Sequence, residues 1–234
     1  MGVQPRALLA EFLGTLILLA VIVGSGIAAE RLSPGEVGPQ LLESALVTAL
    51  GLFAIIAVFL PISGAHFNPI VSVVDGVLGS RRWGSVLAYL PVQVAGAVAG
   101  TVLANLMFGL APVALSTKDR LSWPTALAEV VATAGLVLVI FLLARSGRSA
   151  LIAPAVAAWI GAAYFFTSST SFANPAVAIG RMLSDTFAGI APWSALGFIA
   201  AQVVGGLVGL VLVHALVSER SARLRRGDDE NRTR

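Results

Sequence analysis

Residues 63–73 read Ser-Gly-Ala-His-Phe-Asn-Pro-Ile-Val-Ser-Val, and residues 170–179 read Thr-Ser-Phe-Ala-Asn-Pro-Ala-Val-Ala-Ile. Each stretch passes from small and polar residues through Asn-Pro into an apolar run. Asn is a favoured helix N-cap and Pro is favoured at the first helical position, so a short helix is predicted to begin at each Asn-Pro. About ten helical residues span ~15 Å, half of a ~30 Å hydrocarbon core. Two such half-helices, entering from opposite faces, would meet at the midplane of a membrane.

The composition around these stretches is that of a protein embedded in a lipid bilayer. Of 234 residues, 57% are hydrophobic and 12% are charged, with a mean hydropathy of +0.91. Soluble domains carry about 25% charged residues, and disordered chains are less hydrophobic still. The net charge of +3 reflects basic residues between apolar runs, which indicates membrane orientation rather than nucleic-acid binding.

Enzymatic and metal chemistry find no support in the sequence. The chain has no Cys, and His66 and His214 lie 148 positions apart. No nucleophile–base pair or metal cluster can be assembled from it. We therefore expect that the protein is not an enzyme and that it binds neither a cofactor nor a metal ion.

Six apolar runs are long enough to cross a membrane. The fifth lies within an uncharged stretch of 32 residues, too long for one helix, which leaves apolar material for a half-helix. The runs are 7–29, 41–60, 83–108, 124–144, the first part of 149–180, and 192–217.

The chain also repeats itself. Ala10-Glu11-Phe12 is echoed by Ala128-Glu129-Val130, and the two Asn-Pro pairs are 106 residues apart. Gln93-x-x-Gly96-x-x-x-Gly100 is echoed by Gln202-x-x-Gly205-x-x-x-Gly209. We predict one channel domain, 1–218, built from repeats near 1–114 and 121–218. Because each repeat has three spans, the second must be inverted relative to the first, an architecture typical of transport proteins.

The positive charges are distributed unevenly. Eleven of the fifteen Lys and Arg residues fall on the side that holds both termini, and four fall on the other side. The positive-inside rule then places both termini in the cytoplasm of a multi-pass protein of the cell membrane. Residues 219–234 are mostly charged and are predicted to form a disordered cytoplasmic tail.

Residues 63–69 resemble the first signature of the major intrinsic protein family, the aquaporins and aquaglyceroporins, and Asn174-Pro175-Ala176 resembles the second. The resemblance runs from about residue 7 to residue 217. It implies an all-α membrane protein with six transmembrane helices and two re-entrant half-helices in an inverted 3+3 repeat. It further implies one pore per subunit, a homotetramer, and passive flux of water or small uncharged solutes.

The expected roles follow from the positions of the residues. Asn68 and Asn174 are expected to donate amide N–H groups to a passing oxygen, where the positive ends of two helix dipoles oppose cations. Glu11 and Glu129 are carboxylates inside spans, which invites a proton-relay reading. Their matching positions favour the alternative, that each accepts hydrogen bonds from a re-entrant loop. The loop residues expected to line the pore are Gly64, Ala65, His66, Phe172 and Ala173, with Pro69, Ile70, Pro175 and Ala176 completing the motifs.

The outer filter departs from the family pattern. Members commonly carry Arg three residues after the second Asn, where this chain has Val177. Carried over from their distance to the Asn-Pro pairs, the other filter positions are Thr48, Ala162 and Ser171. These residues are small or medium in size, so we expect a wide constriction without a cation.

The nearest positive charge to this filter is Arg181, four residues beyond Val177. It either faces the pore or pairs with Asp185, four residues further along the chain. We expect the pairing.

The sequence thus predicts a passive channel for glycerol-like polyols, undissociated metalloid hydroxides such as arsenous acid, and water. A water-selective aquaporin is the alternative within the channel class. An ion- or proton-coupled secondary transporter is the alternative from another class, and it requires an acidic residue exposed in the pathway.

Overall fold

The chain folds into a bundle of helices. The structure, a computed structural model, describes residues 4–232, with side chains described for residues 4–217. The helices are α1 (Pro5–Leu32), α2 (Val37–Ser63), α3 (Pro69–Val77), α4 (Trp83–Met107), α5 (Trp123–Arg145), the 3-10 turn η1 (Ser149–Leu151), α6 (Ile152–Phe166), α7 (Pro175–Arg181) and α8 (Pro192–Arg232).

Within the described residues, six stretches of helix are long and apolar enough to cross a membrane: α1, α2, α4, α5, η1 with α6, and α8 as far as Val217. Two further helices, α3 and α7, have nine and seven residues and begin at the two Asn-Pro pairs. These are the six spans and two half-helices predicted from the sequence, and the fold class is confirmed.

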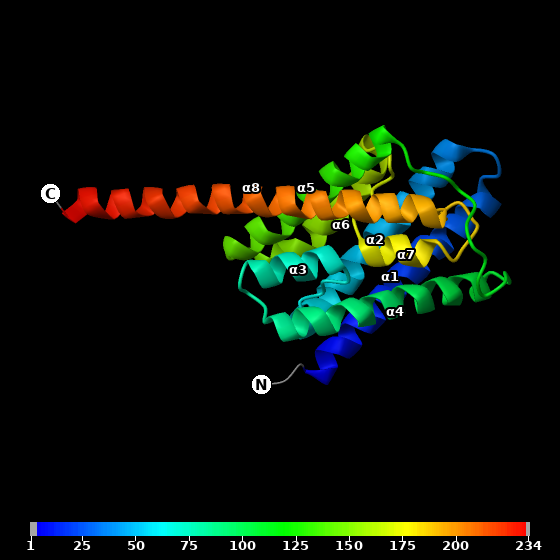
Figure 1. The fold of residues 1–234 in the computed structure, drawn as a ribbon, viewed down its shortest axis with the longest axis horizontal. Coiled ribbons are helices and arrows are strands. Elements are labelled where there is room, and N and C mark those ends of the chain that lie inside the picture. Colours follow the sequence, from blue (N-terminus) through cyan, green and yellow to red (C-terminus); the bar gives the residue numbers. More distant parts are fainter. Residues whose placement is uncertain (1–3, 233–234) are drawn as a thin grey trace.

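The two halves of the chain have the same order of elements, since α1–α4 correspond to α5–α8. Figure 1 shows α3 and α7 inside the bundle, and α1 begins and α8 ends toward the same end of the molecule. Three spans in each half reverse the direction of the second repeat, so α3 and α7 approach each other with their N-terminal ends.

Local sequence signals set where several helices begin and end. At the start of α5, the Ser122 side chain accepts a hydrogen bond from the Thr125 N–H, and the Thr125 side chain accepts one from the Ser122 N–H. This capping box satisfies donors that a helix start leaves open. At the end of α2, Gly64 has a φ of 92°, a left-handed conformation that glycine adopts without steric cost. The chain therefore turns from α2 into the loop that leads to Asn68.

Glycines at matching places bring two pairs of helices into close contact. A Cβ atom on Gly96 would lie 2.5 Å from the carbonyl oxygen of Phe12, and one on Gly205 would lie 2.6 Å from that of Val130. Neither distance leaves room for a side chain. The spacing therefore serves packing of α1 on α4 and of α5 on α8 within one chain, as expected for small-xxx-small pairs.

The end of α8 differs from the prediction. Residues 219–232 continue the helix as far as Arg232, where the sequence predicts a disordered tail. Four of the ten residues 217–226 are Arg, and Glu219, Ala222 and Leu224 are also strong helix formers, so their local preference extends the helix. The side chains beyond Val217, and residues 233–234, lie outside the described part of the chain.

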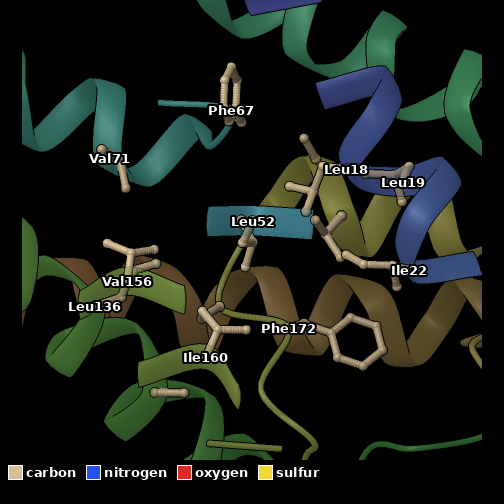
Figure 2. Packing of buried hydrophobic residues seen from close by; sticks show 14 of the residues in the cluster. Leu18, Leu19, Ile22, Leu52, Phe67, Val71, Leu136, Val156, Ile160 and Phe172 are labelled. Atoms are coloured by element: carbon tan, nitrogen blue, oxygen red, sulfur yellow. The ribbon is translucent and has the colours of Figure 1, made fainter. Parts of the chain in front are cut away.

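A cluster of buried apolar side chains fills much of the interior of the bundle. Figure 2 shows Leu18 and Ile22 of α1, Leu52 of α2 and Ile160 of α6 gathered toward a common region. All four are buried and all four also line the central cavity described below. The same side chains therefore form part of the core and the apolar wall of that cavity.

Candidate pore and its lining

The starts of α3 and α7 are built alike. The Asn68 side-chain oxygen accepts a hydrogen bond from the Ile70 N–H at 2.9 Å, and that of Asn174 accepts one from the Ala176 N–H at 2.9 Å. Pro follows each Asn as the first helical residue. Each Asn thus caps its half-helix through its oxygen, which leaves its amide N–H groups for other partners.

The two Asn residues also tie the half-helices together. Asn68 Nδ2 donates to the carbonyl oxygen of Ala173 at 2.8 Å, and Asn174 Nδ2 donates to that of Phe67 at 2.7 Å. Each amide nitrogen carries two hydrogens, and both Asn residues line the cavity. The second hydrogen of each amide is therefore available to a solute at the point where two helix dipoles present their positive ends.

Glu11 holds the loop before α3. It is fully buried, and its Oε1 accepts from Ser63 Oγ at 2.6 Å and from the His66 N–H at 3.0 Å. Its Oε2 accepts from the Phe67 N–H at 2.7 Å and from Gln93 Nε2 at 2.8 Å. Each oxygen of Glu11 therefore accepts two hydrogen bonds, and two of the four donors are backbone N–H groups of the loop.

Glu129 holds the loop before α7 in the same way. It is also fully buried, and it accepts from the N–H groups of Phe172 and Ala173, both at 2.8 Å, and from Gln202 Nε2 at 2.7 Å. Neither Glu11 nor Glu129 belongs to the lining of the cavity. The two carboxylates therefore lie behind the loops rather than in the pathway.

The two loops share an unusual backbone. Ala65, Phe67, Ser171 and Ala173 have φ values of 49°, 50°, 51° and 49°, in a region that side chains disfavour. Such residues cost on the order of 1–3 kcal/mol each. The carboxylates stabilise this conformation by bonding the N–H groups of Phe67 and Ala173, one strained residue in each loop.

Where the first loop has a larger residue than the second, that residue packs against a glycine. A Cβ on Gly14 would lie 2.0 Å from the Phe67 ring, so the glycine makes room for Phe67, whose counterpart in the second loop is Ala173. Ile70, bulkier than its counterpart Ala176, packs against Gly206, where a Cβ would lie 2.6 Å from Ile70. The added bulk at Ile70 is accommodated behind the loop, and the Asn68 cap is retained.

A cavity of about 380 Å³ runs through the bundle beside both loops. Regularly spaced side chains supply its walls: Thr48, Leu52, Ile56 and Leu60 from α2, and Val156, Ile160 and Tyr164 from α6. These positions recur every four residues, so each set forms one helical face. Gly64, Ala65 and His66 from the first loop, and Ser171, Phe172 and Ala173 from the second, also line the cavity.

A polar cluster occupies the end of the cavity nearest the C-terminus of α3. Asp75 Oδ2 lies 3.2 Å from His66 Nε2 and 3.1 Å from Arg81 Nε. Arg81 also donates to the carbonyl oxygen of Ser63 and to the Tyr89 hydroxyl. Of these residues, only His66 is predicted from the sequence to line the pore, and Asp75 and Arg81 are not. Asp75 could have been identified from the sequence, because it is an acidic residue within the short apolar helix α3.

The opposite end contains three of the four expected filter residues. Thr48, Ser171 and Val177 line the cavity, whereas Ala162 is exposed on the outer surface of α6 and does not. The prediction for Ala162 is wrong. Ala162 follows the cavity-lining residue Ile160 by two positions, which turns its side chain by about 200° around the helix axis and away from the cavity. Tyr164 lines the cavity instead, and its hydroxyl donates to Thr48 Oγ1 at 3.1 Å. The four-residue spacing of Val156, Ile160 and Tyr164 was the sequence signal that identifies it.

The expected pairing of Arg181 with Asp185 is also wrong. Arg181 is buried and lines the cavity, and its Nε donates to the carbonyl oxygen of Ala188. Asp185 is exposed, and its carboxylate accepts from the N–H and hydroxyl of Thr117. The backbone hydrogen bond from Thr117 is the main cause that holds the pKa of Asp185 below its usual value. Because α7 ends at Arg181, the helical spacing on which the pairing relied does not extend to Asp185.

Comparisons with known proteins agree with this geometry. The family model described as Major intrinsic protein matches residues 3–173. Aquaglyceroporin AqpS of Rhizobium meliloti (strain 1021) is 41% identical over 225 residues, 96% of each chain. Probable aquaporin TIP2-2 of Oryza sativa subsp. japonica is 30% identical over 215 residues, 88% of this chain and 85% of that one. The X-ray structure of the aquaglyceroporin from Plasmodium falciparum has a TM-score of 0.65 at 22% identity, covering 89% of this chain and 93% of that one.

Six spanning helices around a cavity, with two capped half-helices meeting beside it, define a membrane channel with re-entrant pore helices. The chain belongs to the major intrinsic protein family. It is a multi-pass membrane channel for water and small solutes, and not an enzyme.

Proposed function

We propose that the cavity conducts small uncharged solutes passively: glycerol-like polyols, undissociated metalloid hydroxides such as arsenous acid, and water. The observation that carries this proposal is Val177, an apolar residue lining the cavity at the filter position where the family commonly has Arg. An uncharged side chain there leaves more room than a guanidinium and presents an apolar surface to the carbon atoms of a polyol.

The outer end of the cavity offers such a solute both apolar side chains and hydroxyl groups. Val177 and Ile22 are apolar, while Thr48, Tyr164 and Ser171 supply hydroxyl groups. A polyol can place its carbon atoms against the first set and its hydroxyls against the second, so that little hydrogen bonding is lost on leaving water. Tyr164 makes this end narrower than the sequence alone predicts, which favours slender solutes over branched ones. The names of an aquaglyceroporin and of a glycerol uptake facilitator among its relatives support the same substrate class.

The alternative of an ion- or proton-coupled transporter requires an acidic group in the pathway. Glu11 and Glu129 lie outside the cavity lining and are occupied by loop donors. Asp75 does line the cavity, but it lies between His66 and Arg81. These arrangements favour a passive channel over a coupled transporter.

The experiment that tests this function is solute flux through proteoliposomes carrying Val177→Arg, with Val177→Met as a control for size without charge. If the added guanidinium raises the barrier by about 1.4 kcal/mol, glycerol flux falls about tenfold. Water flux should fall less, because water is smaller. Equal glycerol flux in wild type and Val177→Arg would overturn the assignment of Val177 to the filter.

We further propose that four copies of the chain form a homotetramer in the cell membrane, each copy with its own pore in a channel domain that spans residues 1–218. Large apolar side chains are exposed along the outside of the bundle, among them Leu46, Leu50 and Phe53 on α2, and lipid or neighbouring subunits would cover them. Both termini and the charged residues 219–234 would face the cytoplasm, in line with the eleven positive charges on that side. Native mass spectrometry tests the subunit number, and protease accessibility of the C-terminus in sealed vesicles tests the orientation.

A further inference from the structure

A buried cation lies at the outer end of the cavity. Arg181 is 4% exposed and lines the cavity. Within the described part of the chain, its side chain makes one hydrogen bond, from Nε to the carbonyl oxygen of Ala188, and forms no ion pair. Its two Nη groups, with four N–H bonds between them, therefore remain available to whatever occupies the cavity.

The position of Arg181 relates it to the filter. It follows Val177 by four residues, about 6 Å along the axis of α7 toward the outer face. Helical side chains tilt toward the N-terminus, so the Arg181 side chain leans back over the turn that carries Val177. Its guanidinium carbon lies 3.5 Å from the centre of the Phe172 ring, and Phe172 also lines the cavity.

Among the described residues, no acidic side chain forms an ion pair with Arg181. Arg120 lies 5.8 Å from the Phe172 ring and donates to the carbonyl oxygens of Gly189 and Phe187, so it adds a second cation to the region. Of the surrounding acids, Glu129 is occupied by three donors beneath the loop, and Asp185 is exposed and bonded to Thr117. No ion pair among the described residues therefore neutralises the two guanidinium groups at this end of the cavity.

A free hydroxyl accompanies the cation. Ser171 is 4% exposed and lines the cavity, and its Oγ has no hydrogen-bond partner among the described residues. An unpaired buried hydroxyl is costly, and a solute hydroxyl is the partner that the cavity can bring to it. Ser171 and the Nη groups of Arg181 thus offer an acceptor and donors for the oxygen atoms of a passing solute.

We propose that Arg181 is the cation of the outer filter, displaced about one helical turn from the position that Val177 occupies. It donates to solute hydroxyl oxygens together with Ser171, and its charge excludes protons and other cations from a pore whose filter position is apolar. This inference rests on the proposed function, because it assigns a selectivity residue to the same pore.

The test compares proton and glycerol flux in the same proteoliposomes. Proton flux is followed with an enclosed pH-sensitive dye under a potential clamped by K⁺ and valinomycin, and glycerol flux by light scattering. The variants are Arg181→Gln, Arg181→Lys, and the double variant Val177→Arg with Arg181→Gln, which moves the charge back by one turn. Arg31→Gln is the control, because Arg31 is exposed at the outer end of α1 and lies outside the cavity lining.

We expect Arg181→Gln to raise proton flux about tenfold or more, since a unit charge within about 10 Å changes the equilibrium population of a proton by at least a factor of about ten at an effective dielectric constant of about 20. Arg181→Lys and the double variant should both restore low proton flux, which general damage to the fold would not allow. Arg31→Gln should match wild type.

Unchanged proton flux in Arg181→Gln, with glycerol flux present in wild type, would overturn the inference and leave the proposed function standing. A rise that neither Arg181→Lys nor the double variant reverses would also overturn it. Absence of glycerol flux in wild type would instead overturn the proposed function.

Discussion

Glu11→Gln separates loop support from proton relay, because it removes the charge and keeps the size of the side chain. In the wild type, each oxygen of Glu11 accepts two hydrogen bonds. Gln has one oxygen and one NH₂ group, so two of the four groups that donate to Glu11 in the wild type would face the NH₂ group, which is itself a donor. Ser63 can turn its hydroxyl to accept, but the backbone N–H of His66 has no such freedom.

The magnitude follows from that one stranded group. A buried N–H without a partner costs about 1–3 kcal/mol. If the amide turns the other way, the N–H of Phe67 is stranded instead, and the cost is similar. For a chain of this size, each kcal/mol lowers the melting temperature by about 2–4 °C, so we expect a decrease of about 2–12 °C. Glu129→Gln strands one N–H, that of Phe172 or of Ala173, and should behave alike.

The assay is thermal unfolding of the purified protein in detergent, paired with glycerol flux per unit of reconstituted protein. Loop support predicts a lower melting temperature with flux within about twofold of wild type, since the stranded N–H points toward residue 11, outside the cavity lining, and changes the barrier by less than about 0.5 kcal/mol. The control is Glu36→Gln, an exposed residue before α2. An unchanged melting temperature together with lost flux would refute this reasoning and favour the relay.

Two further predictions concern packing and the filter. Gly100→Ala places a Cβ 2.1 Å from the carbonyl oxygen of Leu16, so it should destabilise the protein by about 1–3 kcal/mol. The control is Gly84→Ala, which has nothing within 4 Å of the added atom and should not destabilise the protein. Equal melting temperatures for the two variants would contradict the close approach of α1 and α4. Tyr164→Leu removes a hydroxyl and ring atoms from the outer cavity. The permeability of four-carbon polyols relative to glycerol should therefore rise by about threefold or more, equivalent to about 0.7 kcal/mol in the barrier. Ala162→Val, at an exposed position, should leave this permeability ratio unchanged, and the reverse pattern would restore Ala162 to the filter.

The fold could be predicted because its signals are local and duplicated. Asn68 and Asn174 are each followed by Pro, and the capping hydrogen bonds that such a pair predicts are present at both. Glu11 and Glu129 lie at matching places in the two repeats. Their shared role, accepting hydrogen bonds from the loop before a half-helix, could therefore be predicted once the repeat was found.

The filter could be predicted only in part, because its side chains come from elements whose facing is set by packing. Distance along the chain predicts Ala162 in the filter, whereas Tyr164 shares the helical face of Ile160 and lines the cavity. The pairing of Arg181 with Asp185 assumed that α7 continues, but the helix ends at Arg181. Where a short helix stops is decided by tertiary contacts, here the hydrogen bond from Arg181 to the carbonyl oxygen of Ala188, which pattern alone does not contain.

The central claim, a passive pore for small uncharged solutes, is tested most directly by stopped-flow light scattering of wild-type proteoliposomes under an inward glycerol gradient. The vesicles first shrink as water leaves and then swell as glycerol enters. We predict swelling much faster than in protein-free vesicles, at a rate independent of membrane potential and of any proton gradient. Fast shrinkage followed by swelling no faster than in protein-free vesicles would contradict the claim and leave a channel that passes water alone.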